Sequence, residues 1–263
     1  MWRSPEDLIM IGFGRSRVVM MNENHDGLLR CCRTREIGSR ILPTAHQAGV
    51  RYLAMEALNL LFAEECNRTR HMPEAREGYL SQPEMRELIQ SALDLEWTLI
   101  SYEADMSQVP PVLANKDDMS IAVTNWREEA QARNILSALQ PLPSDAMLLV
   151  WCGNSHHMKE IRHDEQMMIQ RDGEWILISK LAEEPDWMPM GYQFKRMSSI
   201  NPFTIHQYLL DGLSQTLSLC TPQLESFGGT AGFLKEEPPH PFLAHFAQNG
   251  GDAFVFSTQN TME

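Results

Sequence analysis

The chain has 263 residues and a formal net charge of −13 at pH 7. This length allows one large domain or two small ones, and we expect a single α/β domain over residues 1–263. The acidic balance argues against nucleic-acid binding, which usually needs a basic surface, and against anionic membrane surfaces. No apolar run is long enough to span a bilayer, and the first residues lack the pattern of a signal peptide. A cytoplasmic location is therefore expected.

Four apolar runs with strand character alternate with helical patterns along the first 157 residues. The expected strands are residues 17–21, 51–56, 97–103 and 147–152. The expected helices are residues 28–49, with Pro43 as a kink or break, 83–96, with Ser81 as the cap, and 125–139. Because strand, helix and strand follow one another, the pattern predicts a mostly parallel central sheet flanked by helices.

The other segments have weaker patterns. Residues 57–77 are polar and predict an excursion above the sheet, and residues 107–120 predict a loop. In the less regular part, residues 158–263, the turn signal Asp172-Gly173 lies between apolar runs and predicts a β-hairpin over residues 167–178. We also expect a short helix at 201–205 and a final strand at 252–256, added to the main sheet.

Each of the four expected strands leads into an acid or a histidine. These residues are Glu23, His25, Glu56, Glu103 and His156. Ligands of open parallel sheets bind beyond the carboxyl ends of the strands. If the strands lie side by side, the five side chains converge on one crevice. Carboxylates and imidazoles together suit a divalent metal or general acid–base chemistry.

Several of these residues also have a purely structural interpretation. Glu56 ends an apolar strand, so its charge needs a partner, for which Arg127 or Arg51 is available. Arg127 is either a surface helix residue or an anchor for substrate. Glu103 and Asp105 are either supporting groups of the site or solvated loop acids.

The histidines and the cysteine near the fourth strand leave further alternatives. His156 and His157 are adjacent, so only one of them is expected to enter the site, and His157 reads as a helix-start or surface residue. His163 is a rival ligand if the segment is helical. Cys152 could be a nucleophile beside a histidine, although a buried strand thiol is the commoner case.

The motifs at these strand ends resemble those of the superfamily of erythromycin esterases, ChaN-like haem-binding proteins and Tiki/TraB-type metalloproteases. Its G-E-x-H motif corresponds to residues 22–25, with Asn22 in place of the glycine. An acidic strand end corresponds to Glu56, and G-x-x-H corresponds to residues 153–156. Residues 126–134 resemble the arginine-bearing helix of the esterase branch. The resemblance covers residues 17–157 and implies an α/β hydrolase-like fold.

By this resemblance, the chain is expected to be an esterase-like or peptidase-like hydrolase acting on an ester, a lactone or a peptide. The reactive residues would be Glu23, His25, Glu56 and His156, and Arg127 and Glu103 would bind substrate. Either a histidine or carboxylate base activates water, or Glu23, His25 and His156 hold a divalent metal that does so. The alternatives are haem or iron binding, as in ChaN, and a cyclase or lyase on the same site. A small-molecule or peptide substrate is expected as the partner, and a homo-oligomer is compatible with the sequence.

Overall fold

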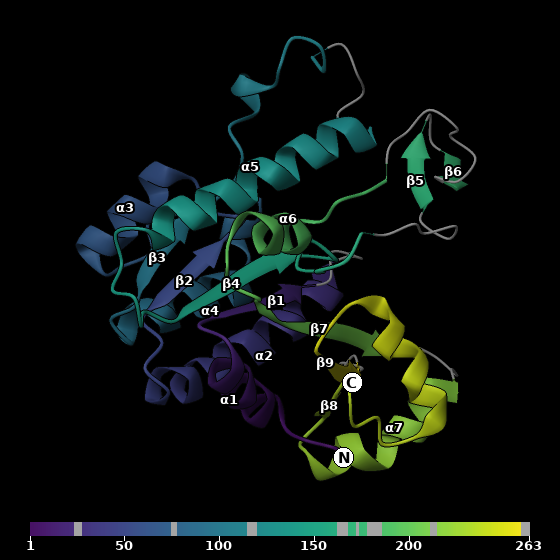
Figure 1. Cartoon of the computed structure of the whole chain (residues 1–263). Helices are drawn as coiled ribbons and strands as arrows, with labels where there is room; N and C mark the ends of the chain where they lie inside the picture. Colours follow the sequence, from purple (N-terminus) through teal and green to yellow (C-terminus); the bar gives the residue numbers. More distant parts are fainter. Residues whose placement is uncertain are drawn as a thin grey trace.

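The computed structural model describes residues 1–23, 28–74, 78–114, 120–161, 168–171, 174–177, 186–210 and 215–258. Its centre is a seven-stranded sheet in the order β3-β2-β4-β1-β7-β9-β8 (Figure 1). The strands are β1 Val18–Glu23, β2 Tyr52–Met55, β3 Thr98–Ser101, β4 Leu148–Gly153, β7 Phe203–Leu210, β8 Thr230–Leu234 and β9 Ala253–Thr258. All neighbouring pairs are parallel except β8 and β9, which are antiparallel.

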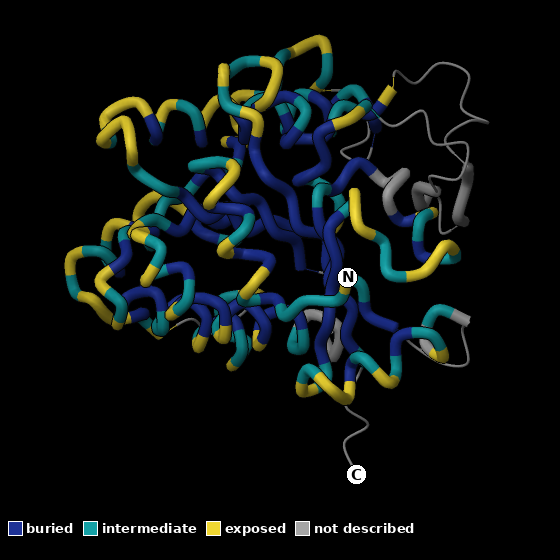
Figure 2. Tube along the Cα trace, turned by 60° about the horizontal axis from the view of Figure 1, so that its bottom comes forward, coloured by how far each residue is buried: buried dark blue, intermediate teal, exposed yellow. Residues whose placement is uncertain are grey.

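The helices cover the sheet on both faces. They are α1 Pro5–Arg15, α2 Leu28–Gln47, α3 Leu60–Thr69, α4 Pro83–Asp94, α5 Ile121–Leu139, α6 Met190–Met197 and α7 Gln215–Ser226. Short 3₁₀ segments are η1 Tyr79–Ser81, η2 Met106–Gln108 and η4 Pro241–Asn249. Figure 2 shows the buried strands in the middle of the molecule, with exposed residues on the outer helices and loops. Among the described residues, no helix is long and apolar enough to cross a bilayer.

The two faces of the sheet have separate apolar cores. Helices α1, α2 and α4 pack on one face, where alternate strand residues such as Val19, Leu53 and Leu149 point. Helices α5 and α6 pack on the other face, against Met20, Ala54 and Val150. Because side chains alternate along a strand, a strand that is buried on both faces reads as a continuous apolar run. This explains why the first and fourth strands were visible in the sequence.

The structure confirms the α/β fold with a mostly parallel sheet and flanking helices, including all four expected strands and the final one. Strands β5 Met168–Arg171 and β6 Glu174–Leu177 pair in antiparallel fashion, as expected of the hairpin. Helix α2 runs through Pro43 without a break. Helix α5 starts four residues earlier than expected, because Ser120 caps it by accepting from the Val123 amide.

Three expectations about local structure are wrong. Residues 203–210 form strand β7 rather than a short helix, because their backbone pairs in parallel with both β1 and β9. Residues 60–69 form helix α3, capped by Asn59, and do not rise above the sheet as a polar excursion. Gln82, and not Ser81, occupies the N-cap position of α4, where its side chain makes no capping hydrogen bond, and Ser81 lies in η1. Four further elements, α1, α6, α7 and β8, were not predicted from the sequence, although Ser4 and Asp7 form a capping box at the start of α1.

A close contact fixes helix α6 against the chain that follows β4. The Gly191 amide donates to the carbonyl of His156, and a Cβ atom at Gly191 would lie 2.2 Å from the carbonyl oxygen of His157. We therefore expect Gly191→Ala to lower the free energy of unfolding by about 1–3 kcal/mol, as overpacking does. Gly14→Ala is the control, since nothing lies within 4 Å of its added methyl group. Urea unfolding of both variants tests this, and equal stabilities would contradict it.

Candidate functional site

The four strand ends do meet at one edge of the sheet. Strands β3, β2, β4 and β1 are neighbours in that order and are parallel, so their carboxyl ends lie together. A pocket of about 400 Å³ opens there. Its lining includes Glu23, Glu56, Glu103, Arg127 and His156. Residues 24–27 lie outside the described part of the chain, so the expectation for His25 is untested, and the catalytic roles of the others stay predictions.

Arg127 links two of the strand-end carboxylates. Its Nε donates to Glu103 Oε1 at 3.0 Å, and its Nη2 donates to both Glu103 Oε2 and Glu56 Oε1. No hydrogen bond from Nη1 reaches any residue in the described part of the chain. Arg127 is therefore a partner of Glu56, as one alternative expected, and it also keeps one nitrogen available to a ligand.

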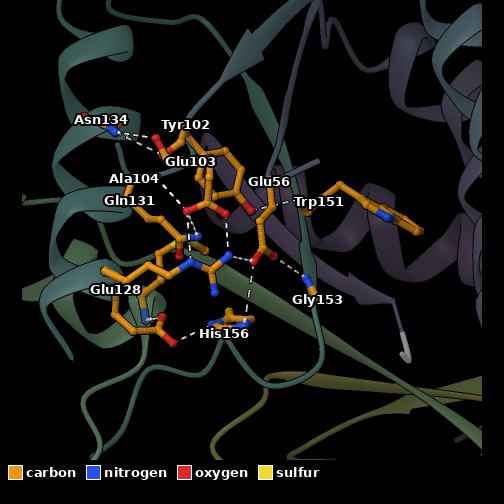
Figure 3. A network of polar contacts seen from close by, with 12 residues as sticks. Glu56, Tyr102, Glu103, Ala104, Glu128, Gln131, Asn134, Trp151, Gly153 and His156 are labelled. Carbon is orange, nitrogen blue, oxygen red and sulfur yellow. Dashed lines mark hydrogen bonds and ion pairs between the residues drawn. The ribbon is translucent and has the colours of Figure 1, made fainter. Parts of the chain in front are cut away.

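Glu103 is held from three sides. Besides Arg127, it accepts from the Gln131 side chain at 3.0 Å and from its neighbouring amide at Ala104. Figure 3 shows Gln131 on the α5 side of Glu103 and Glu56 on the opposite side. Asp105 instead caps the exposed turn η2, which fits the interpretation as a solvated loop acid. Glu103 thus fixes the guanidinium group of Arg127 more than it offers a reactive oxygen.

His156 lies between two carboxylates (Figure 3). Its Nδ1 is 2.5 Å from Glu128 Oε1, and its Nε2 is 3.9 Å from Glu56 Oε1. Burial disfavours the imidazolium, but the charges of Glu128 and Glu56 outweigh it and raise the pKa of His156 to about 9. His156 is therefore protonated at neutral pH, and its Nε2–H points into a space beyond hydrogen-bond reach of Glu56.

Glu56 is held as a carboxylate. Burial opposes its ionisation, but His156, Arg127 and the amide of Gly153 outweigh that effect and lower the pKa of Glu56 to about 2. The Gly153 amide donates to Glu56 Oε2 at 2.9 Å. Such a carboxylate is a weak base, so its described contacts suit electrostatic stabilisation better than proton abstraction.

Glu23 is buried and fully engaged by its neighbours. Arg35 of α2 binds both of its oxygens at 2.8 Å, and Trp151 of β4 donates to Oε2 at 2.8 Å. Arg35 is itself completely buried. Asn22, which stands where the related motif has glycine, accepts from the Gln207 amide at 2.6 Å and so ties β1 to β7.

Two residues of this arrangement, Glu128 and Arg35, were missed in the sequence. Glu128 accepts hydrogen bonds from His156, from the Trp187 indole and from the Met190 amide. A signal was present, because Glu128 lies four residues before Ala132 on the buried stripe of α5. Arg35 likewise lies seven residues before Leu42 on the buried face of α2. A charged residue on an apolar helix stripe needs a buried partner.

The remaining candidates are placed as follows. His157 is buried rather than on the surface, and its Nε2 is 3.2 Å from Nδ1 of His206. Cys152 is a buried strand thiol, and burial raises its pKa well above the ordinary value, which argues against a nucleophile. Arg51 binds backbone carbonyls instead of Glu56. His163 lies outside the described residues.

The described donors do not fit a metal ion. Arg35 occupies Glu23, and Arg127 occupies Glu56 and Glu103, so guanidinium groups already supply the positive charge. No group of three or more His, Cys, Asp or Glu side chains suited to a metal occurs within the described ranges. The predicted set of Glu23, His25 and His156 cannot be assessed as a whole, because His25 lies outside these ranges.

A solved structure shares the fold over the full length of the chain. No family model and no curated protein matches the sequence. Among solved structures, a mutant of the erythromycin esterase EreC in its open conformation superposes with a TM-score of 0.59 at 9% identity, covering 100% of this chain and 99% of that one. The chain therefore has the fold of this erythromycin esterase. This confirms the fold that the motif resemblance implies.

Other solved structures match less well or over a shorter span. The type III effector HopBA1 has a TM-score of 0.54 at 12% identity, covering 98% of this chain and 94% of that one. ChaN of Campylobacter jejuni has a TM-score of 0.48 at 11% identity, with coverages of 96% and 91%. The chain spans only 36% of RRSP, a toxin effector domain from Vibrio vulnificus (TM-score 0.47, 11% identity). At these identities the likeness concerns the fold alone.

The Glu23–Arg35 pair generates a stability prediction. Arg35→Met would leave a buried carboxylate without its guanidinium, and we expect a loss of about 3–5 kcal/mol in the free energy of unfolding. Arg133→Met is the control, since its pair with Glu129 is exposed and contributes about 0.5 kcal/mol or less. Chemical unfolding measures both. Similar losses in the two variants would contradict a buried ion pair at Glu23.

The raised pKa of His156 leads to a prediction about how stability depends on pH. A group whose pKa is higher in the folded state stabilises the fold fully below its unfolded pKa, here 6.5, and this contribution disappears as the pH rises through about 9. The stability difference between the wild type and His156→Gln should therefore be larger below pH 6.5 than above pH 9, by up to a few kcal/mol. Unfolding curves at the two pH values test this. A constant difference would mean that the pKa of His156 is the same in the folded and unfolded states.

Proposed function

We propose that the chain is a hydrolase that cleaves an ester, a lactone or a peptide, with His156 as the proton donor. The observation that carries the proposal is the position of the His156 imidazolium between Glu128 and Glu56, in a pocket that also holds Arg127. The fold is compatible with this, since an erythromycin esterase shares it. A fold hosts many chemistries, so the argument depends on the site.

Two hydrogen-bond donors of the pocket are proposed to act on different atoms of the substrate. Arg127 Nη1 would donate to the oxygen of the scissile carbonyl group and His156 Nε2 to the leaving group, and no hydrogen bond to a described residue occupies either nitrogen. Donors that are fixed before the reaction stabilise the negative charge that develops on a carbonyl oxygen. Glu103, Gln131 and Glu56 hold the guanidinium group in place, so little reorganisation is needed.

His156 would complete the bond cleavage. The water oxygen bonds to the carbonyl carbon, the bond from that carbon to the leaving oxygen or nitrogen breaks, and His156 Nε2 gives its proton to the leaving group. A protonated His156 cannot also accept a proton from the water. That role is proposed for His25, as the sequence suggests, with Glu23 and Arg35 anchoring the strand that leads to it. A cyclase or lyase would use the same donors without water.

Activity assays with the matched variants test this proposal. We expect the purified protein to hydrolyse members of a panel of p-nitrophenyl esters, lactones and peptides. His156→Gln should lower kcat by about 10²–10⁴-fold, as the loss of a general acid does. Arg127→Lys should lower kcat as well, whereas Arg133→Lys, on the exposed face of α5, should not. A Soret band in the purified protein, without hydrolysis, would favour the haem-binding alternative.

The pH dependence of the rate gives a more specific prediction. Because His156 donates a proton, kcat/KM should fall as the pH rises through about 9. Glu128→Gln removes the carboxylate next to Nδ1, so the pKa of His156 should fall and the decline should begin at a lower pH. Glu129→Gln, one residue away on the exposed side, serves as the control. A rate that rises with pH through this range would identify His156 as a base.

A further inference from the structure

Large apolar side chains are exposed on segments that adjoin the pocket lining along the chain. Leu60 and Leu61 are 63% and 77% exposed in the first turn of α3, Tyr79 is 47% exposed and Met106 is 42% exposed. Single exposed apolar residues are common on proteins and need no explanation. These four residues need an explanation, because the segments that carry them begin at residues that line the pocket.

Each of the three segments starts at a residue that lines the pocket. Tyr79 lines it directly, Leu60 follows the lining residue Ala57 by three positions, and Met106 follows the lining residue Glu103 by three. Three residues of chain span at most about 11 Å. The Cα atoms of Leu60 and Met106 therefore lie within about 11 Å of the Cα atoms of Ala57 and Glu103, which line the pocket. We call Leu60, Leu61, Tyr79 and Met106 the apolar rim.

The pocket itself is divided between polar and apolar chemistry. The polar part is the network of Glu56, Glu103, Arg127 and His156. The apolar part is formed by Ala57, Tyr79, Met85 and Trp151, on the side of the α2 and α4 layer. Tyr79 belongs to both the apolar part and the rim, so the apolar surface continues from the pocket to the outside.

We propose that the substrate is an uncharged amphiphile, whose apolar part extends out of the pocket and lies on the apolar rim. This rests on the proposed function and specifies its substrate class as a medium- or long-chain ester or lactone. The net charge of −13 disfavours anionic chains and anionic lipid surfaces. An uncharged chain meets no such repulsion, and burying it against the rim contributes binding free energy in proportion to the area covered.

A series of p-nitrophenyl acetate, butyrate, octanoate and dodecanoate tests the proposal. We expect kcat/KM to rise with chain length, by at most about fourfold for each methylene that becomes buried. Met106→Gln and the double variant Leu60→Gln/Leu61→Gln should reduce kcat/KM several-fold for the long esters and leave it unchanged for the acetate. Met10→Gln is the matched control, because Met10 is also 42% exposed but lies on α1. Equal effects on all esters, or none, would overturn the proposal.

A binding experiment separates this proposal from the proposed function. N-butylacetamide and N-octylacetamide are uncharged probes, and isothermal titration with His156→Gln measures their binding without catalysis. Tighter binding of the octyl probe, lost in the rim variants but retained in Met10→Gln, would support the rim even if no ester were hydrolysed. Hydrolysis without any dependence on chain length would keep the proposed function and refute the amphiphilic substrate. Absence of both would refute both.

Discussion

Three carboxylates at the carboxyl edge of the sheet must be neutralised, and the arrangement of the site depends on how this is done. Glu23, Glu56 and Glu103 end or follow three of the strands, where burial makes an unpaired charge costly. Arg35 reaches Glu23 from the helix layer on one face of the sheet, and Arg127 reaches Glu56 and Glu103 from the layer on the other. The two guanidinium groups thus connect both helix layers to the strand ends.

This compensation also assigns chemical character to the residues of the pocket. Glu56 is bound by Arg127 and by the Gly153 amide and lies near His156, and these neighbours lower its pKa to about 2 despite its burial, so Glu56 is a poor base. His156, between Glu128 and Glu56, is stabilised as a cation, which suits the role of proton donor that we propose. A sequence with histidine at a strand end suggests a base near neutral pH. The neighbours in space reverse that expectation, because they add negative charge on both sides of the ring.

The C-terminal half supports the site from the other side of β1. Strand β7 pairs with β1, and β9 and β8 extend the sheet beyond it. Asn22 accepts from the Gln207 amide just after the last paired residues of β1 and β7, so its side chain continues the connection between the two strands. The loop that carries His156 is fixed by α6 through the Gly191 amide, and the Met190 amide of α6 donates to Glu128, the partner of His156. The pocket therefore depends on segments far apart in the sequence.

The sequence by itself determined the fold class and the positions of the strand-end residues. The apolar runs that become β1 and β4 are buried on both faces, and such continuous runs can be recognised without knowledge of their neighbours. The tertiary structure decided which charges meet. Arg35 and Glu128 lie 12 and 28 residues from Glu23 and His156, and only packing brings them together. The same holds for β7, whose residues formed a strand because β1 and β9 were there to pair with them.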